Sequence, residues 1–224
     1  MSRFYYYPEF LRNGEAETLR EVLRAKYPEL PPWIGTLRPE TAKAHNEAHI
    51  ERLKAESRDR IDYSRARSIL RRVQAHPIAC LEALPHFDRS QRIGLCYGRA
   101  YAALLEARQR GISERSMRKF FIIGDLSGKT SLWNFHSVTA VAGKNPEGWW
   151  VIDPHLAEPV LPSEWVRQFT RVLARDVDDI ALFFATSPKQ MTRDPHSTVE
   201  QALASPIVGR FFHELLRSYD VSVP

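Results

Sequence analysis

The chain has 224 residues, 43% hydrophobic and 26% charged, a composition typical of one globular domain with additions. The formal net charge is +5, but basic and acidic residues are mixed along the chain, which argues against a dedicated nucleic-acid surface. No stretch has the ~18 apolar residues of a membrane span, and the first residues lack the apolar run of a signal peptide. We therefore expect a protein that stays in the cytoplasm or is exported without a cleaved signal peptide.

The first ninety residues are predicted to be mostly helical and of unknown role. A helix is expected near 15–26, prolines then break the chain, and polar helices fill 40–75. His45 and His49 are four residues apart on one helix, a spacing that allows two ligands to share a metal ion. Their order differs from the His-Glu-x-x-His pattern and no third ligand is evident, so we predict a solvated helix face and no metal site.

Residues 94–100, Gly-Leu-Cys-Tyr-Gly-Arg-Ala, place a cysteine at the start of a predicted helix. From Cys96 onward apolar residues recur every three or four positions, and the helix is expected to stop before Gly111. In the first turn the backbone N–H groups are free and the helix dipole favours an anion, so a thiol there has a lowered pKa. Cys96 is therefore either a small buried apolar residue or a nucleophile.

The other cysteine, Cys80, lies in the apolar segment Ile-Ala-Cys-Leu and is expected to be buried and inert. Two cysteines are too few for a disulfide scaffold. The sequence neither requires nor excludes a bond between Cys80 and Cys96.

Three strands are predicted after the cysteine helix, at 119–124, 133–142 and 149–153, and the last two should form an antiparallel hairpin. The chain then continues with a helix capped by Ser163 and a strand at 179–185. Two final helices are expected, at 198–204 and 206–219.

The register of the hairpin brings two chemically active residues together. If Ala142 pairs with Trp149, then Asp153 pairs with Val138 and lies diagonally opposite His136 on the same face. A carboxylate beside a histidine orients the ring and stabilises its protonated form. Either residue alone could be structural, with His136 a satisfied core histidine and Asp153 a cap of the turn that follows.

The chain has a cysteine at a helix start, then a histidine on a strand and an aspartate that ends the next strand. In this order and in the surrounding residues it resembles the bacterial protein-glutaminase (protein deamidase) domain. That family belongs to the papain and transglutaminase-like group. The similar segments are Gly94-Leu95-Cys96-Tyr97-Gly98-Arg99-Ala100, Trp133-Asn134-Phe135-His136-Ser137-Val138 and Trp150-Val151-Ile152-Asp153-Pro154-His155-Leu156. The resemblance implies an α+β fold whose nucleophile helix packs on an antiparallel sheet. A helical extension at 1–90 would precede a catalytic domain at 91–224.

The resemblance also implies a reaction. Cys96 would attack the side-chain amide of a glutamine in a partner protein, His136 would act as base and acid, and Asp153 would orient His136, with no cofactor. The oxyanion would be held by the Cys96 backbone N–H and a second donor. Gln91 is a candidate for that donor because papain-like enzymes place a glutamine a few residues before the cysteine, although Gln91 could equally be a surface residue.

Three classes of function stay open at this point. The first is a protein-glutamine deamidase, which without a leader would suit an effector or toxin delivered into another cell. The second is a papain-like cysteine protease or a transglutaminase. The third is a non-catalytic binding module on the same fold. Ammonia release from intact protein distinguishes the first class from the second, and unlabelled Cys96 would favour the third. The substrate protein and the oligomeric state are not specified by the sequence.

Overall fold

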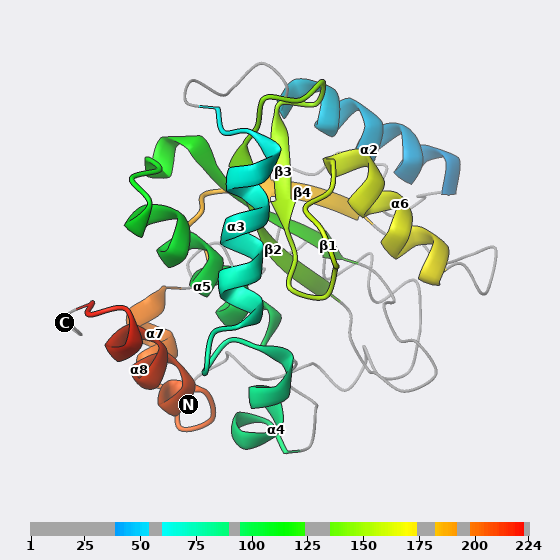
Figure 1. Ribbon diagram of the computed structural model, residues 1–224. Helices are drawn as coiled ribbons and strands as arrows, with labels where there is room; N and C mark the ends of the chain where they lie inside the picture. Colours follow the sequence, from blue (N-terminus) through cyan, green and yellow to red (C-terminus); the bar gives the residue numbers. More distant parts are fainter. Residues whose placement is uncertain are drawn as a thin grey trace.

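The computed structural model describes residues 39–53, 60–89, 95–123, 135–173, 182–191 and 198–221. Within these ranges the protein is an α+β fold of seven α-helices and one four-stranded antiparallel sheet (Figure 1). The helices are α2 (Pro39–Leu53), α3 (Tyr63–Gln74), α4 (Leu84–Phe87), α5 (Cys96–Gln109), α6 (Pro162–Leu173), α7 (Val199–Leu203) and α8 (Gly209–Ser218). None of these helices has both the length and the apolar character that crossing a membrane requires. The helix predicted at 15–26 lies outside the described residues.

The sheet has the order β3-β2-β1-β4, and its strands are β1 (Met117–Ile123), β2 (Phe135–Ala142), β3 (Trp149–Ile152) and β4 (Leu182–Thr186). The predicted hairpin register is confirmed, because Ala142 pairs with Trp149 and Thr139 pairs with Ile152. The next residue after β3 is Asp153. The register therefore places this carboxylate diagonally opposite His136.

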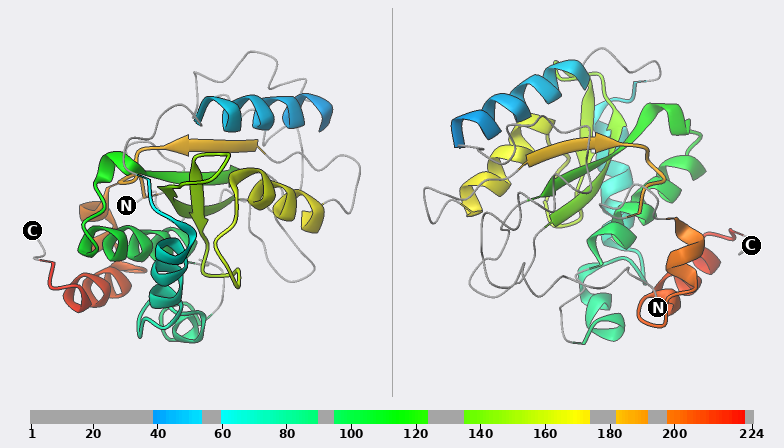
Figure 2. Two further views of the ribbon diagram at one scale, coloured as in Figure 1. Left: turned by 45° about the horizontal axis from the view of Figure 1, so that its top comes forward. Right: turned by 180° about the vertical axis from the view of Figure 1, so that it is seen from behind.

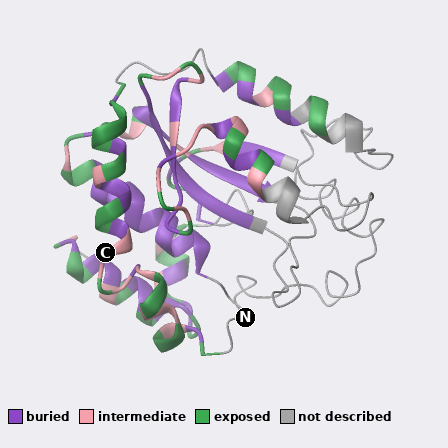
Figure 3. Ribbon diagram, turned by 45° about the vertical axis from the view of Figure 1, so that its right-hand side comes forward, coloured by how far each residue is buried: buried purple, intermediate pink, exposed green. Residues whose placement is uncertain are grey.

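Helices cover both faces of the sheet. Figure 2 shows α2 and α6 on one side and α3 and α5 on the other. Successive strand residues point to opposite faces, so Phe120 and Val138 join the apolar cluster beneath α2 and α6, whereas Phe121 and Val141 join the cluster around α5. The strands and α5 are almost entirely buried, while α2 keeps an exposed outer side (Figure 3).

Helix α5 is the central helix of the fold, because every residue from Cys96 to Ala107 is buried. It packs on β2 and against α3 and α8. Helix α3 belongs to the predicted N-terminal region, yet Ile69 and Leu70 share one apolar cluster with Leu104 of α5. The division of the chain at residue 90 stays a prediction.

Two side chains of α2 bind the backbone of β4. The Asn46 side-chain oxygen accepts a hydrogen bond from the Phe183 N–H at 2.8 Å, and His49 Nε2 accepts one from the Ala185 N–H at 3.2 Å. The prediction of a solvated helix face is therefore wrong for His49, which satisfies a strand N–H through a tertiary contact. The side chain of His45 lies outside the described part of the chain.

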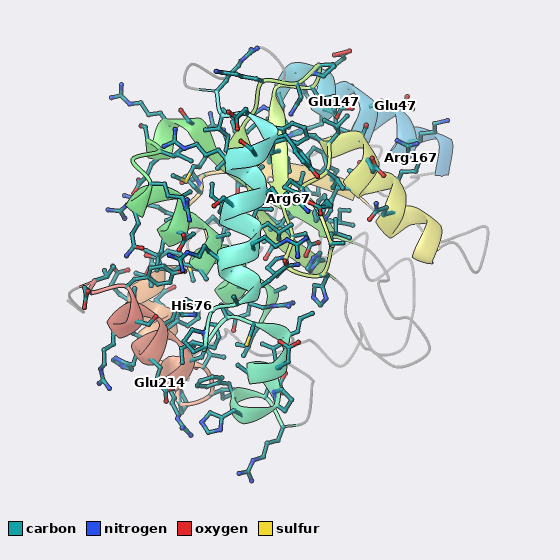
Figure 4. The ribbon with its side chains drawn as sticks, in the orientation of Figure 1. Glu47, Arg67, His76, Glu147, Arg167 and Glu214 are labelled. Atoms are coloured by element: carbon teal, nitrogen blue, oxygen red, sulfur yellow. The ribbon has the colours of Figure 1, made fainter. Side chains whose placement is uncertain are left out.

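Helix α6 begins at Pro162, so Ser163 lies inside the helix and is not its cap. The backbone N–H and the hydroxyl of Ser163 both donate to the carboxylate of Glu147, in the β2–β3 loop. Figure 4 labels Glu147 in this position between the hairpin and α6. A carboxylate from another element thus accepts a hydrogen bond from a first-turn N–H that a local cap was expected to satisfy.

Helix α8 begins at Gly209 rather than at Pro206. Ser205 caps a separate turn before the helix, because its hydroxyl accepts hydrogen bonds from the N–H groups of Ile207 and Val208. The preceding short helix, α7, has Thr198 as its cap, close to the predicted start.

Replacing Gly98 by alanine should destabilise the fold. A Cβ at this position would lie 2.4 Å from Cε1 of Phe211 on α8, so the buried ring or one of the two helices would have to shift. Overpacking of this kind costs about 1–3 kcal/mol of unfolding free energy, which urea denaturation measures. Phe211→Leu removes the clashing ring, so Gly98→Ala with Phe211→Leu should cost less than the sum of the single variants. Strictly additive losses would show that this contact does not govern the packing of α8.

Candidate active site

Cys96 is the first residue of α5, as predicted. The residue before it, Leu95, is fully buried and has a φ of 46°, in the left-handed region that side-chain-bearing residues rarely adopt. Leu95 makes no side-chain capping bond to the first turn. Cys96 lies at the positive end of the helix dipole, which favours the thiolate form.

His136 and Asp153 form a buried pair at the predicted diagonal of the hairpin. His136 Nε2 lies 2.8 Å from Asp153 Oδ2. The residues are 1% and 0% exposed, so water does not screen their charges. Because Nε2 is bonded to Asp153, Nδ1 is the ring nitrogen through which His136 can exchange a proton with a thiol.

Two further groups fix the Asp153 carboxylate. The Trp165 indole N–H, from α6, donates to Oδ2 at 2.9 Å, and the His155 backbone N–H donates to Oδ1 at 3.0 Å. The Trp165 ring also packs on His136, with 5.9 Å between ring centroids. From the sequence, Trp165 is predicted only to face inward from its helix. The signal that could have found it is chemical, since a buried indole N–H requires an acceptor.

The thiol of Cys96 contacts two adjacent residues of β2. Ser137 donates its hydroxyl hydrogen to Sγ at 3.7 Å, and the ring of His136 lies near enough to lower the pKa of the thiol. Burial raises the pKa of Cys96, but the hydrogen bond and the charge of His136, followed by the Ser137 contacts, lower it by more. The net effect is a lowered pKa, which favours the thiolate.

The charges of His136 and Asp153 stabilise each other. Burial lowers the pKa of His136, but the carboxylate of Asp153 and its hydrogen bond raise it to about 9. Burial also raises the pKa of Asp153, and the opposing effect of His136 is larger, so this pKa lies well below its usual range. The structure therefore favours an imidazolium between a carboxylate and a thiolate until the pH rises through about 9.

Arg99 brings a further positive charge to the site. It lies one turn after Cys96 on α5, is 1% exposed and contacts Nε2 of His155. Burial lowers the pKa of Arg99, while the charges of Asp153 and Cys96 raise it. Partial burial and the Arg99 charge lower the pKa of His155, which favours its neutral form. No role for Arg99 was predicted beyond its place in the segment that resembles protein-glutaminases.

Helix α3 holds the loop that follows Asp153. The Gln74 side-chain amide donates to the carbonyls of Pro154 at 3.4 Å and Leu156 at 2.8 Å. On the surface of the same loop, Glu158 pairs with Arg67, which Figure 4 labels on α3, at 2.8 Å. An exposed ion pair contributes little free energy, so Gln74 is the more important of these contacts.

Among the described residues, His136, Asp153 and His155 have ligand atoms that all lie within 4.8 Å of one another, close enough to share a metal ion. These atoms already have other partners, since His136 binds Asp153 and His155 contacts the Arg99 guanidinium. A cation would compete with a protonated His136 and would face Arg99, so we derive no chemistry through a metal here.

The structure thus brings Cys96, His136 and Asp153 together, whereas Gln91 lies outside the described residues. Both cysteines are free thiols, and Cys80 is partly exposed rather than buried as predicted. Cys80 lies in the turn that follows α3 and ends at the short 3-10 helix Leu81–Ala83, where its backbone N–H reaches back to His76.

Comparison of the chain with models of known protein families, with curated proteins and with solved structures finds no match.

Alkylation should distinguish the two thiols. Exposure alone favours Cys80, because Cys96 is only 4% exposed. The lowered pKa of Cys96 favours the opposite order, since the thiolate is the reactive form. We expect iodoacetamide at mildly acidic pH to modify Cys96 first, as measured by mass spectrometry of tryptic peptides.

His136→Ala is the matched control for this experiment. It leaves both cysteines in place and removes the group that lowers the pKa of Cys96. The order of labelling should then reverse, with Cys80 modified first. Faster labelling of Cys80 in the unaltered protein would contradict an activated Cys96.

Proposed function

We propose that this protein is a cysteine hydrolase that converts glutamine side chains of a partner protein to glutamate and ammonia, on a papain and transglutaminase-like core. The single observation that carries the proposal is the connected set of contacts from Cys96 to His136 and from His136 to Asp153, at the start of a buried helix. Opposed pKa shifts in adjacent buried groups are typical of a nucleophile and its base.

In the first half-reaction, the Cys96 thiolate attacks the carbon of the glutamine carboxamide and a C–S bond forms. His136, already protonated, donates its proton to the amide nitrogen as the C–N bond breaks. Ammonia leaves, and the substrate remains attached to Cys96 as a thioester. The backbone N–H groups at the start of α5 would donate hydrogen bonds to the developing oxyanion.

In the second half-reaction, His136 is neutral and removes a proton from water. The resulting hydroxide attacks the thioester, the C–S bond breaks, and Cys96 returns to the thiolate while His136 keeps the proton. Asp153 retains its negative charge throughout. Its three hydrogen bonds keep the imidazole aligned while the ring charge appears and disappears.

The choice of glutamine amides over other acyl groups rests on the resemblance of three segments to protein-glutaminases. Peptide cleavage and transamidation use the same thioester chemistry and are outcomes of the test. A binding module that keeps the fold is less well supported, because such a module has no use for a buried thiol with a lowered pKa.

The three residues should contribute unequally to ammonia release from a protein substrate. Cys96→Ala removes the atom that bonds to the substrate, so turnover should vanish. His136→Ala should lose nearly as much, because nucleophile and base act as one unit, and the double variant should be no worse than Cys96→Ala. Asp153→Asn should reduce kcat by a large but smaller factor, since it disturbs the tautomer of His136 rather than removing it.

Ammonia is measured together with the glutamine-to-glutamate mass change, and thermal melting confirms that each variant is folded. Cys80→Ala is the matched control and should keep full activity, because Cys80 has no part in the proposed mechanism. New peptide termini or cross-links in place of ammonia would assign the protein to the second class. Full activity in folded Asp153→Asn would remove Asp153 from the mechanism.

A further inference from the structure

Strand β1 carries a fully buried lysine that the proposed mechanism does not use. Lys119 is 0% exposed. Its neighbours two residues away, Met117 and Phe121, pack in the apolar cluster around α5, so strand alternation points Lys119 toward the same helix. Burying an ammonium costs considerable free energy, and an apolar side chain would fill a core position without that cost.

The sheet register places Lys119 beside the first turns of α5. Lys119 pairs with Thr139 on β2, and the Thr139 hydroxyl donates to the carbonyl of Ala100 at 2.6 Å. Ala100 lies one turn after Cys96. Two residues before Thr139 on the same face, Ser137 contacts the Cys96 sulfur. Lys119 and Cys96 therefore face one narrow region between the sheet and α5.

The electrostatic surroundings of Lys119 are simple. Among the described residues, its Nζ has no hydrogen-bond acceptor. Burial lowers the pKa of Lys119 to about 7, and the charge of Cys96 raises it. The residues paired with Lys119 on β2 and β4 are Thr139 and Thr186, which do not titrate. Cys96 is thus the ionisable group that acts on Lys119.

We propose that Lys119 is a positioning residue whose buried ammonium helps His136 to hold Cys96 as a thiolate. The inference depends on the proposed function only in treating Cys96 as the nucleophile. The two cations have different roles. His136 gives its proton to the leaving ammonia and loses its charge, whereas Lys119 takes no part in proton transfer and, below about pH 7, keeps a positive charge beside the sulfur.

Arg99 does not substitute for Lys119 in this role. Its guanidinium contacts His155, and the carboxylate of Asp153 acts on it more strongly than Cys96 does. Arg99 is therefore part of the surroundings of Asp153, while Lys119 faces the nucleophile.

The test compares Lys119→Met, which has a similar shape and no charge, with Lys119→Arg, which keeps the charge. The readout is the rate of Cys96 alkylation by iodoacetamide as a function of pH, followed by mass spectrometry. Lys119→Met should shift the alkylation profile toward higher pH. Labelling should be roughly tenfold slower at acid pH, as expected for a rise of about one in the pKa of Cys96. Lys119→Arg should keep the profile of the unaltered protein.

Lys144→Met is the matched control for net charge. Lys144 is exposed in the β2–β3 loop. It follows the last residue of β2, whereas His136 lies near the first residue of that strand. Its replacement removes the same unit of charge from the chain and should leave the alkylation profile unchanged. A shift as large as that of Lys119→Met would show a general effect of net charge and would overturn the proposal.

Melting measurements separate this role from a structural one. At Lys119 the unfolded chain binds more protons than the folded chain between pH 7 and the ordinary pKa of lysine, 10.5, so this residue contributes stability that grows as the pH rises through this window. His136, with its pKa raised to about 9, contributes the opposite trend up to that pH in both proteins, so the readout is the difference in stability between the unaltered protein and Lys119→Met. Lys119→Met should lose that gain without a lower melting temperature at neutral pH. If Lys119→Met does not fold, Lys119→Gln provides the uncharged side chain for the same comparison with Lys119→Arg.

An alkylation profile that is unchanged in a folded, uncharged variant would overturn the proposal. This outcome is independent of the substrate, because iodoacetamide labelling needs no turnover. A shifted profile in a protein that releases no ammonia would support the role of Lys119 and contradict the proposed deamidation. An unchanged profile in an active deamidase would do the reverse.

Discussion

The buried pair of His136 and Asp153 is the constraint on which the rest of the site depends. Two opposite charges with almost no solvent contact are stable only while each keeps its partner and its remaining hydrogen bonds. The hairpin register, the start of α6 and the loop after β3 all supply such bonds. The indole of Trp165 and the backbone of His155 complete the coordination of the carboxylate. The charge on Cys96 follows from this pair, since the imidazolium is what favours the thiolate.

The parts of the site that could be predicted from sequence are those set by local geometry. The apolar spacing after Cys96 predicted α5, because helix periodicity extends over several turns. The loop between Ala142 and Trp149 predicted the register, since alternation allows few pairings that bury the apolar face. Once the register is known, the meeting of His136 and Asp153 follows from strand geometry alone.

The parts that could not be predicted depend on contacts between elements far apart in the chain. Trp165 has the spacing of a core residue, and only the position of α6 directs its N–H to Asp153. His49 has the pattern of a surface helix, and only the docking of α2 on β4 gives it a strand N–H to accept. Lys119 lies in an otherwise apolar stretch of β1, and periodicity does not explain a lysine there. The group that Lys119 faces, Cys96, belongs to a different element, α5.

The hydrogen bonds from Gln74 to the loop after β3 connect residues about eighty positions apart in the chain. Contacts of such long sequence separation form late in folding, because a large loop must close first. During synthesis Cys96 leaves the ribosome well before His136 and Asp153, the residues that lower its pKa. The nascent chain therefore carries an ordinary thiol, and the nucleophile becomes reactive only when the protein has reached its native topology.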